Sequence, residues 1–339
     1  MALARSRVSC ASSPAFRVSK RASHRLWPTR SSAISSPRPW RWSSARDTCV
    51  SRCAGWSNAP SSSRKRDAER PAPQSRHPRA TGSVPSVSIV LPTRDRPARL
   101  REALERVARQ THPELELVLV RDGGAPLSAE VIGLLDRLEF PARVLDHDDP
   151  PEGLAASRDR GIRASRADSI AFLDDDDLWE PGHVARLSAA LDRDPGVDVA
   201  YTDAWVLNEE SGGRRTLAQD FELEVFMRDS FIPPSAILAR RSAFDRFGLF
   251  DTEIPYSEDW DWLLRVALGQ GRIQRVPGAS VTIRIHKGGM SQLHNSDHAA
   301  GRRQSLDILS NRYGLPPIEL KTFWEVAGDL CPEANSSTR

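Results

Sequence analysis

The length and charge of the chain indicate one folded domain preceded by a basic extension. The sequence has 339 residues and a formal net charge of +3, but this charge is unevenly distributed. Residues 1–83 contain 15 Arg and 2 Lys against 2 Asp and 1 Glu, a charge of +14 that leaves −11 for the remainder. A basic folded domain that binds nucleic acid is therefore excluded, and no nucleic-acid partner is expected for it.

Residues 1–83 are expected to form a disordered extension. They are rich in Arg, Ser and Pro, and their few apolar residues follow neither the period of a strand nor that of a helix. Such a segment cannot bury enough apolar surface to offset the entropy lost on ordering. Three interpretations stay open: an organellar targeting sequence, a dispensable extension, or an electrostatic tether to an anionic membrane or nucleic acid.

The sequence predicts an intracellular protein without a membrane span. No stretch approaches the roughly 18 apolar residues that a transmembrane helix needs, and no hydrophobic core of a secretory signal is present. Of the four cysteines only Cys331 lies outside the extension, which excludes a disulfide framework in the folded part. We expect a cytoplasmic location, with peripheral contact to the inner face of the membrane as the alternative.

From Val84 onward, apolar strands alternate with helical patterns, as in α/β domains with a mainly parallel sheet. Pro97 suits the first position of a helix, because its ring fixes φ and its missing N–H is not needed there. The elements expected in this half, alternately strand and helix, are 86–91, a helix from Pro97, 115–120, 131–138, 142–145, 153–164 and 169–173.

The second half has a mixed pattern. After a helix opened by Pro181, strands are expected at 197–201, 235–239, 272–276 and 280–285, with a helix from Glu258. Residues 208–229 show no readable pattern, and residues 296–330 predict one or two terminal helices. We therefore expect a folded domain over residues 84–295 and a C-terminal helical segment, 296–339, that packs on it.

Four consecutive aspartates, Asp174 to Asp177, follow the apolar run 170–173. Because that run is a predicted strand, the carboxylates emerge at its carboxyl end, where open α/β sheets bind ligands. Adjacent negative charges repel one another unless a cation compensates them, and Mg²⁺ or Mn²⁺ with oxygen ligands does so well. The simpler interpretation is a solvated acidic loop. An EF-hand calcium loop is excluded, because Trp179 stands where glycine is required.

Several segments, in order, resemble family 2 glycosyltransferases of the GT-A fold over roughly residues 86–290. The segments are Ser88–Arg96, Gln110–Val120, Arg121–Gly124, Gly153–Gly161, Phe172–Asp177, Ser257–Arg265 and Arg284–Ser291. The resemblance implies a Rossmann-like sheet flanked by helices that binds a nucleotide-diphosphate sugar. Phe172–Asp177, which matches the family's Asp-x-Asp signature, is the most specific of these segments.

The resemblance implies a set of donor-binding residues: Pro92, Thr93, Asp122, Arg158, Asp174 and Asp176. Asp122 stands where the family contacts the base of the donor. The residue before it, usually aspartate, is Arg121 here, so the identity of the base is not predicted. Considered without the family, Asp122 belongs to an ordinary Asp-Gly turn and Arg158 to the surface of an amphipathic helix.

The resemblance also implies a metal site formed by Asp176, Asp177 and His286. Their assignment among the neighbouring carboxylates is left open, and a lone histidine at the end of a strand is as readily structural. A metal bridging the two donor phosphates would neutralise the charge that develops on the departing nucleoside diphosphate.

Asp259 is the candidate catalytic base, because its segment resembles the family's Glu-Asp motif. In the first turn of a helix the dipole favours an ionised carboxylate, and Trp260 and Trp262 are suited to limit water and to contact sugar faces. Asp261 is the alternative base. In the simpler interpretation, the acids only cap the helix and the tryptophans are core residues.

The resulting prediction is an inverting, metal-assisted glycosyltransferase, with cell-surface polysaccharide or glycolipid synthesis as its setting. The donor would be a UDP-, GDP- or TDP-sugar and the acceptor a saccharide or a lipid-linked molecule. One alternative is a degenerate domain that only binds carbohydrate or a protein partner, since Arg121 and Asp159 depart from the family pattern. The other is a phosphotransferase of the haloacid dehalogenase type, although Leu178 does not match that motif. Dehydrogenases and P-loop ATPases are excluded, because neither glycine-rich phosphate motif occurs.

Overall fold

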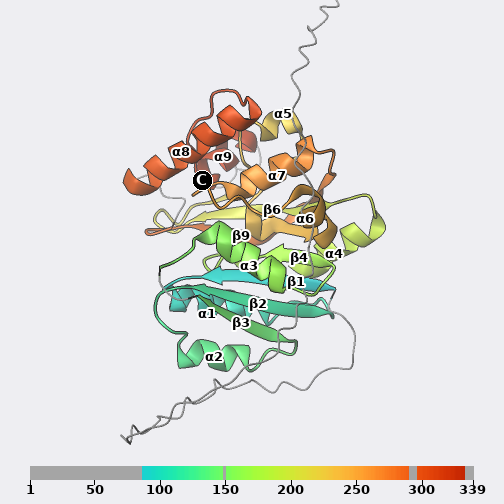
Figure 1. The fold of residues 1–339 in the computed structure, drawn as a ribbon, viewed down its shortest axis with the longest axis vertical. Coiled ribbons are helices and arrows are strands. Elements are labelled where there is room, and N and C mark those ends of the chain that lie inside the picture. Colours follow the sequence, from blue (N-terminus) through green and yellow to red (C-terminus); the bar gives the residue numbers. More distant parts are fainter. Residues whose placement is uncertain (1–85, 148–149, 290–295, 333–339) are drawn as a thin grey trace, which may run out of the picture. The chain divides into compact units, whose positions relative to one another are not determined.

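The computed structural model describes residues 86–147, 150–289 and 296–332 (Figure 1). Within them the chain forms an α/β fold in which helices flank one mixed sheet, so the expected fold class is confirmed. The basic extension, residues 1–83, lies outside the described residues, and so do Met290 and Ser291 at the end of the last matching segment.

The first half is a parallel sheet of alternating strands and helices, in the strand order β3-β2-β1-β4. Its elements are β1 (Val87–Thr93), α1 (Pro97–Val107), β2 (Leu115–Asp122), α2 (Ala129–Leu135), β3 (Ala142–His147), α3 (Leu154–Ala164) and β4 (Ser169–Phe172). Every element predicted for this half is present. The first three strands extend beyond their predicted carboxyl ends, which brings Thr93 and Asp122 onto the sheet edge that carries the site.

The second half continues the sheet as β8-β6-β9-β5, with β7 paired to β6. Its elements are β5 (Leu178–Trp179), α4 (His183–Arg193), β6 (Val199–Asn208), β7 (Arg214–Leu217), α5 (Leu223–Phe226), a 3₁₀ turn (Pro234–Ala236), β8 (Ile237–Arg240), α6 (Arg241–Phe247), α7 (Glu258–Leu268) and β9 (Ile273–Ile285). Strand β8 runs antiparallel to both β4 and β6, whereas β9 runs parallel to β6. The second half is therefore mixed, as its sequence pattern predicts.

Three details of the second half differ from expectation. The strands expected at 272–276 and 280–285 are one strand, β9, whose register against β6 shifts beside Thr202 and Asp203. Such a bulge accommodates Pro277, which has no N–H to donate, and Gly278, whose φ is +98°. The helix expected to open at Pro181 begins at His183, and the patternless stretch 208–229 contains β7 and α5.

Helix α3 packs closely on β1 at a single glycine. A Cβ at Gly161 would lie 2.3 Å from Cγ1 of Val90, closer than any normal contact. Because Val90 also pairs with Phe172 across to β4, this contact sets the height of α3 above both strands. It thereby fixes the position of Arg158, one turn earlier on α3, near the carboxyl ends of the strands.

The C-terminal helices α8 (Ser296–Tyr313) and α9 (Phe323–Leu330) contact the second half. The guanidinium of Arg312 and the hydroxyl of Tyr313 each donate a 2.7 Å hydrogen bond to Oδ1 of Asp261 on α7. The guanidinium of Arg215 on β7 lies 4.2 Å from the ring of Trp324. In the described ranges, no helix combines the length and the hydropathy needed to cross a bilayer.

Candidate active site

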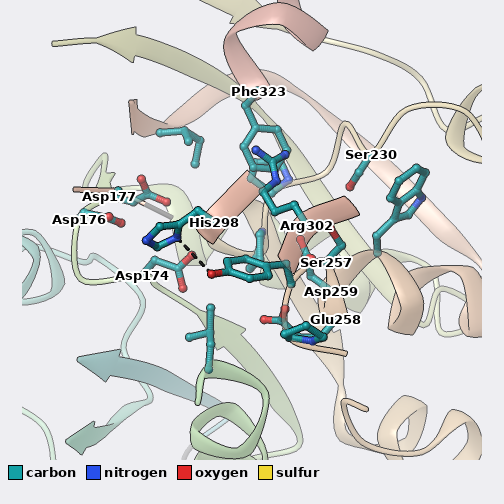
Figure 2. A pocket seen from close by; sticks show the side chains of 18 of the residues that line it. Asp174, Asp176, Asp177, Ser230, Ser257, Glu258, Asp259, His298, Arg302 and Phe323 are labelled. Atoms are coloured by element: carbon teal, nitrogen blue, oxygen red, sulfur yellow. Dashed lines mark hydrogen bonds between the residues drawn. The ribbon is translucent and has the colours of Figure 1, made fainter. Parts of the chain in front are cut away.

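The carboxyl ends of β1, β2 and β4 open into a pocket of about 560 Å³, within the usual range for small-molecule sites. The residues predicted to bind the donor or the metal, and the predicted base, all line this pocket: Pro92, Thr93, Asp122, Arg158, Asp174, Asp176, Asp177, Asp259 and His286. Figure 2 shows the acidic run on one side of the pocket and the start of α7 on another.

Arg158 bridges two acids of the pocket from a fully buried position. Its Nη2 donates a 2.7 Å hydrogen bond to Oδ1 of Asp174, and its Nη1 donates to Oε1 of Glu258. Burial lowers the pKa of Arg158, but the charges of Asp174, Glu258 and Asp259 outweigh it and the pKa is raised. The guanidinium therefore stays charged and ties the acidic run to α7. Both of these hydrogen bonds go to protein carboxylates.

Asp175 points back into the protein. Its Oδ2 accepts a 2.7 Å hydrogen bond from the hydroxyl of Thr93, and its Oδ1 lies 3.2 Å from Nη1 of Arg96. Burial and the charge of Asp176 raise the pKa of Asp175 to about 6, although Arg96 and Thr93 oppose the rise. The role of Thr93 that the structure shows is to hold this carboxyl.

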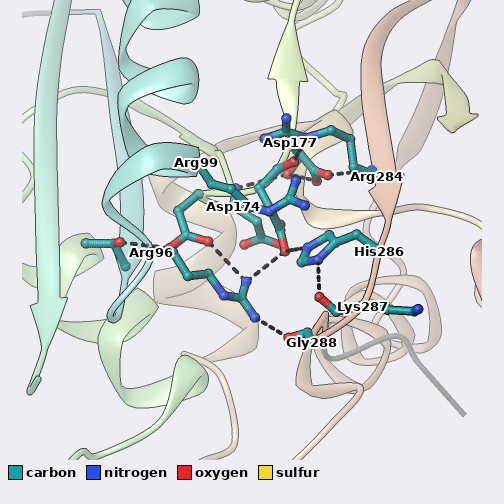
Figure 3. A network of polar contacts seen from close by, with 12 residues as sticks. Arg96, Arg99, Asp174, Asp177, Arg284, His286, Lys287 and Gly288 are labelled. Carbon is teal, nitrogen blue, oxygen red and sulfur yellow. Dashed lines mark hydrogen bonds and ion pairs between the residues drawn. The ribbon is translucent and has the colours of Figure 1, made fainter. Parts of the chain in front are cut away.

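Asp176 is bonded to Arg96 and His286, two of the residues labelled in the polar network of Figure 3. Its Oδ2 lies 2.8 Å from Nη1 of Arg96 and 3.0 Å from Nε2 of His286. Burial would raise the pKa of Asp176, but the hydrogen bond with His286 and the charge of Arg96 outweigh burial, so the pKa is lowered. Arg96 also donates to the carbonyl of Gly288 at 2.9 Å, which links the start of α1 to the turn after β9.

Asp177 is enclosed by protein donors. Its Oδ2 accepts a 2.7 Å hydrogen bond from Ser235 and its Oδ1 a 3.1 Å bond from the backbone N–H of Arg284. Burial and the charges of Asp176 and Asp174 raise its pKa well above the usual range. Since both oxygens are already engaged, Asp177 braces the loop between β4 and β5 against β9. Its role as a metal ligand stays a prediction.

Sequence reasoning missed two arginines that surround the acidic run. Arg96 follows β1, and Arg284 ends β9, where its guanidinium contacts the carbonyl of Asp176 and the carboxylate of Glu102. Both belong to segments quoted for the family likeness, yet nothing in a single sequence marks them as neighbours of the aspartates. The excess of carboxylates at the end of a buried strand was the one sign that arginines lie nearby, because such a cluster needs positively charged neighbours.

Asp122 also contacts protein rather than open space. Its two oxygens accept hydrogen bonds from the backbone N–H groups of Glu152, at 2.9 Å, and Gly153, at 2.8 Å. These contacts fix the loop that leads into α3. Arg121, which replaces the usual aspartate, pairs with Asp146 of β3 at 2.7 Å. Contact of Asp122 with a donor base stays a prediction.

Helix α7 presents Asp259 at its first turn, after Ser257 with a left-handed φ of +62°. Asp259 is half-buried and lines the pocket. Burial raises its pKa, and the charge of Arg158 opposes the rise. The preceding Glu258 is buried against Arg158, and burial is the main cause that raises its pKa to about 7.

The other aromatic and acidic residues of α7 serve the core. Trp262 is buried and stacks on Phe244 with 4.5 Å between ring centroids, so its expected contact with a sugar is wrong. Trp260 lines the pocket, with its Nε1 bonded to the carbonyl of Phe226 at 2.8 Å. Asp261 is fully buried among donors from α7 and α8, which removes it as the alternative base.

The donor atoms for a divalent metal are present, but they are not gathered as a finished site. The described residues contain no group of three or more His, Cys, Asp or Glu side chains that could hold a metal as they stand. Asp174 and Asp176 supply carboxylate oxygens, and His286 supplies Nε2, which here lies 3.0 Å from Asp176 while Nδ1 lies 2.9 Å from the carbonyl of Lys287. These oxygen and nitrogen ligands suit Mn²⁺ or Mg²⁺ if the guanidinium of Arg96 moves away from Asp176.

A sheet of this topology, with an acidic run at the end of β4 that faces an acid on α7, defines the GT-A class of nucleotide-sugar transferases. A solved structure of S. aureus TarS 1-349 in complex with UDP-GlcNAc is similar, with a TM-score of 0.52 and 16% identity over 68% of this chain and 73% of that one. The mannosyltransferase PcManGT from Pyrobaculum calidifontis, in complex with GDP-Man and Mn²⁺, has a TM-score of 0.51 and 16% identity over 69% of this chain and 67% of that one. At such identity the likeness shows the fold alone.

Residues 88–248 match the family model for glycosyl transferase family 2. The uncharacterized glycosyltransferase YwdF of Bacillus subtilis (strain 168) is 32% identical over 244 residues, which are 70% of this chain and 87% of YwdF. A PGL/p-HBAD biosynthesis glycosyltransferase of Mycobacterium tuberculosis is 29% identical over 210 residues, 62% of this chain and 80% of that protein. The chain therefore belongs to glycosyltransferase family 2 and is an enzyme. The phosphotransferase alternative is wrong.

Proposed function

We propose that this glycosyltransferase is inverting and metal-assisted, and that it moves a sugar from a UDP-, GDP- or TDP-sugar to the hydroxyl of a saccharide or lipid-linked acceptor. The observation that supports this most directly is the bridge made by Arg158. It joins Asp174 of the acidic run to Glu258, the neighbour of Asp259, inside one pocket. A carboxylate proposed to bind the donor and the helix that carries the proposed base are thus held in a fixed position relative to each other.

The donor is proposed to lie along the carboxyl ends of the parallel strands. Pro92, Thr93 and Asp122 form the floor there, and their backbone positions are set by the parallel pairing of β1 with β2. Arg158 contributes by holding Asp174 in place and by lending positive charge to the pocket where a diphosphate would bind.

The metal is proposed to bind Asp176, Asp177 and His286, with Asp174 beside them as the alternative carboxylate; Asp177 would then give up one of its bonds to Ser235 and Arg284. When bound, the cation would neutralise the negative charge on the leaving nucleoside diphosphate. The chain's own contribution is to hold Asp174 against Arg158 and Asp176 against Arg96, and to exclude water from the buried side of the run.

Asp259 is proposed as the base. Its carboxylate takes the proton of the acceptor hydroxyl while the oxygen of that hydroxyl forms a bond to the anomeric carbon of the donor. The bond from that carbon to the diphosphate oxygen breaks at the same time, and its electron pair leaves with the nucleoside diphosphate. Attack from the face opposite the leaving group inverts the anomeric centre.

The named relatives suggest the setting of the reaction. One is named for PGL/p-HBAD biosynthesis, which fits the expected role in cell-surface polysaccharide or glycolipid synthesis. We propose a cytoplasmic location, with contact to the inner membrane face as an alternative that the +14 charge of residues 1–83 supports.

The test is release of nucleoside diphosphate by the full chain from UDP-, GDP- and TDP-sugars with Mn²⁺ or Mg²⁺. In Asp259→Asn the rate of nucleoside diphosphate release should fall about a hundredfold or more while nucleotide binding is retained, because removal of a positioned base costs about 10² to 10⁴ in rate. Asp176→Ala should lose metal-dependent binding. Asp192→Asn, an exposed aspartate of α4 outside the pocket, is the matched control. Release that is undiminished in Asp259→Asn would contradict the assignment of the base.

A further inference from the structure

A large part of the pocket wall is apolar and comes from the C-terminal segment of the chain. Its side chains belong to α8, to α9 and to the connection between them: Leu306, Ile318, Leu320, Phe323 and Val326. Neither the acidic run nor the base lies on this wall. The matched family region, residues 88–248, ends well before it. The wall therefore has no role in the proposed donor site or in the proposed base.

Polar contacts border the apolar wall and hold its segments together, and Lys321, Asp229 and Arg302 among them also line the pocket. Lys321 pairs with Asp229 at 2.9 Å and with Asp329 at 3.0 Å, so its charge is compensated within the protein. Arg302 donates a 2.5 Å hydrogen bond to the carbonyl of Lys321. Thr322 and Glu325 form a reciprocal cap at the start of α9. A preformed apolar wall loses little conformational freedom when a ligand binds.

The apolar wall adjoins the proposed base. Figure 2 shows Arg302 between Phe323 and Asp259, with Ser257 beside them. Tyr256, just before the base helix, donates its backbone N–H to Ser305 of α8 at 3.1 Å. Helix α8 is thus attached directly to the chain that carries the base. A molecule whose hydroxyl reaches Asp259 would also contact this wall.

The apolar wall is unsuited to the donor. A nucleoside diphosphate carries charge that must be matched, and the metal proposed at the acidic run would supply that match there. The five apolar side chains of the wall offer no partner for phosphate. Lys321 and Arg302 beside them are already bonded to protein groups, so desolvating phosphate against this wall would be costly. An aromatic ring or an alkyl chain, in contrast, gains from contact with Phe323 and the aliphatic side chains around it.

We infer that this wall is the acceptor subsite, and that the acceptor carries an apolar group, an aromatic ring or an alkyl chain, next to its reacting hydroxyl. The inference rests on the proposed function, because it takes Asp259 as the base. It adds the chemical class of the acceptor. Recognition of the acceptor then depends on the apolar group as well as on the sugar or hydroxyl that reacts.

The test compares methyl, phenyl and octyl glycosides of glucose, mannose and N-acetylglucosamine as ligands of the full chain with nucleoside diphosphate and Mn²⁺ present. Binding is measured by ligand-observed NMR titration, and transfer is measured where it occurs. For at least one sugar, the phenyl or octyl glycoside should bind about tenfold more tightly than the methyl glycoside, the size of effect that a few apolar contacts give. Equal affinity across the series for all three sugars would overturn the inference.

Matched variants locate the effect. Ile318→Ala and Phe323→Ala should remove most of the preference for the apolar glycoside, while the affinity for nucleoside diphosphate stays within about twofold. Ile308→Ala is the control, since Ile308 is also partly buried on α8 but does not line the pocket. A preference that persists in both pocket variants overturns the inference. Failure of the unmodified chain to bind nucleotide would instead count against the proposed function.

Discussion

At the scale of single residues, Arg158 holds the most consequential charge in the pocket. Its guanidinium is buried and pairs with both Asp174 and Glu258. Replacing it by methionine keeps much of the volume but leaves Glu258 buried without a partner. We expect Arg158→Met to lose about 3 to 5 kcal/mol of unfolding free energy, the usual cost of breaking a buried ion pair, measured by denaturant titration.

The double variant Arg158→Met with Glu258→Gln isolates the pair. With both charges removed, most of the loss should return, so the double variant should be more stable than Arg158→Met alone. A loss in the double variant equal to the sum of the two single losses would show that the two side chains act independently.

The pH dependence of the reaction belongs to Asp259. A base must be ionised, so kcat/KM should rise as pH rises through its pKa, and burial places that pKa above the usual value of 3.8. The rise should persist in Glu258→Gln, and circular dichroism at each pH controls for unfolding. A profile that is already at its plateau at pH 4 would contradict the prediction.

The acidic run shows how far a single sequence informs about a site. Its location at a strand end, and its closeness to Asp259 and His286, follow from the pattern and the family likeness. The separate surroundings of the aspartates do not, because each depends on a partner from a different element: Arg158, Thr93, Arg96 and Ser235. Those partners lie 16 to 82 residues away along the chain.

At the scale of elements, α3 and β1 are joined at Gly161. A methyl group there would overlap Val90, so Gly161→Ala should lose about 1 to 3 kcal/mol of stability, as overpacked cores do. Gly133→Ala on α2 is the matched control, because the nearest atom lies 3.5 Å away and alanine favours a helix. It should be neutral or stabilising. Equal effects of the two substitutions on the thermal midpoint would refute the close contact.

The elements that sequence reasoning found and missed differ in length and in partner. Strands β1, β2 and β4 of the first half are buried on both faces, so each appears as a largely apolar run. Strands β5 and β7 and helix α5 span only two to four residues. They form because β5 pairs with β9, β7 pairs with β6 and α5 packs on the core. Such short pieces carry no period of their own.

At the scale of the whole molecule, metal and nucleotide should stabilise the fold in a pH-dependent way. The negative charge of the acidic run attracts the metal, and burial raises the pKa of Asp175, which lies beside the proposed ligands, to about 6, so this charge is reduced between pH 7.5 and pH 5.5. Mn²⁺ with nucleoside diphosphate should therefore raise the melting temperature by several degrees at pH 7.5, and by less at pH 5.5. Differential scanning fluorimetry with EDTA as the control measures this. An equal shift at both values, or an undiminished shift in Asp176→Ala, would contradict it.

The Arg158 bridge also has a thermodynamic consequence. One guanidinium is shared between the strand end where the donor is proposed to bind and the helix that carries the base. Whatever displaces one carboxylate from it changes its hold on the other, so the two substrates are expected to influence each other's affinity. Linkage then requires that influence to be reciprocal: the factor by which nucleotide tightens acceptor binding equals the factor by which acceptor tightens nucleotide.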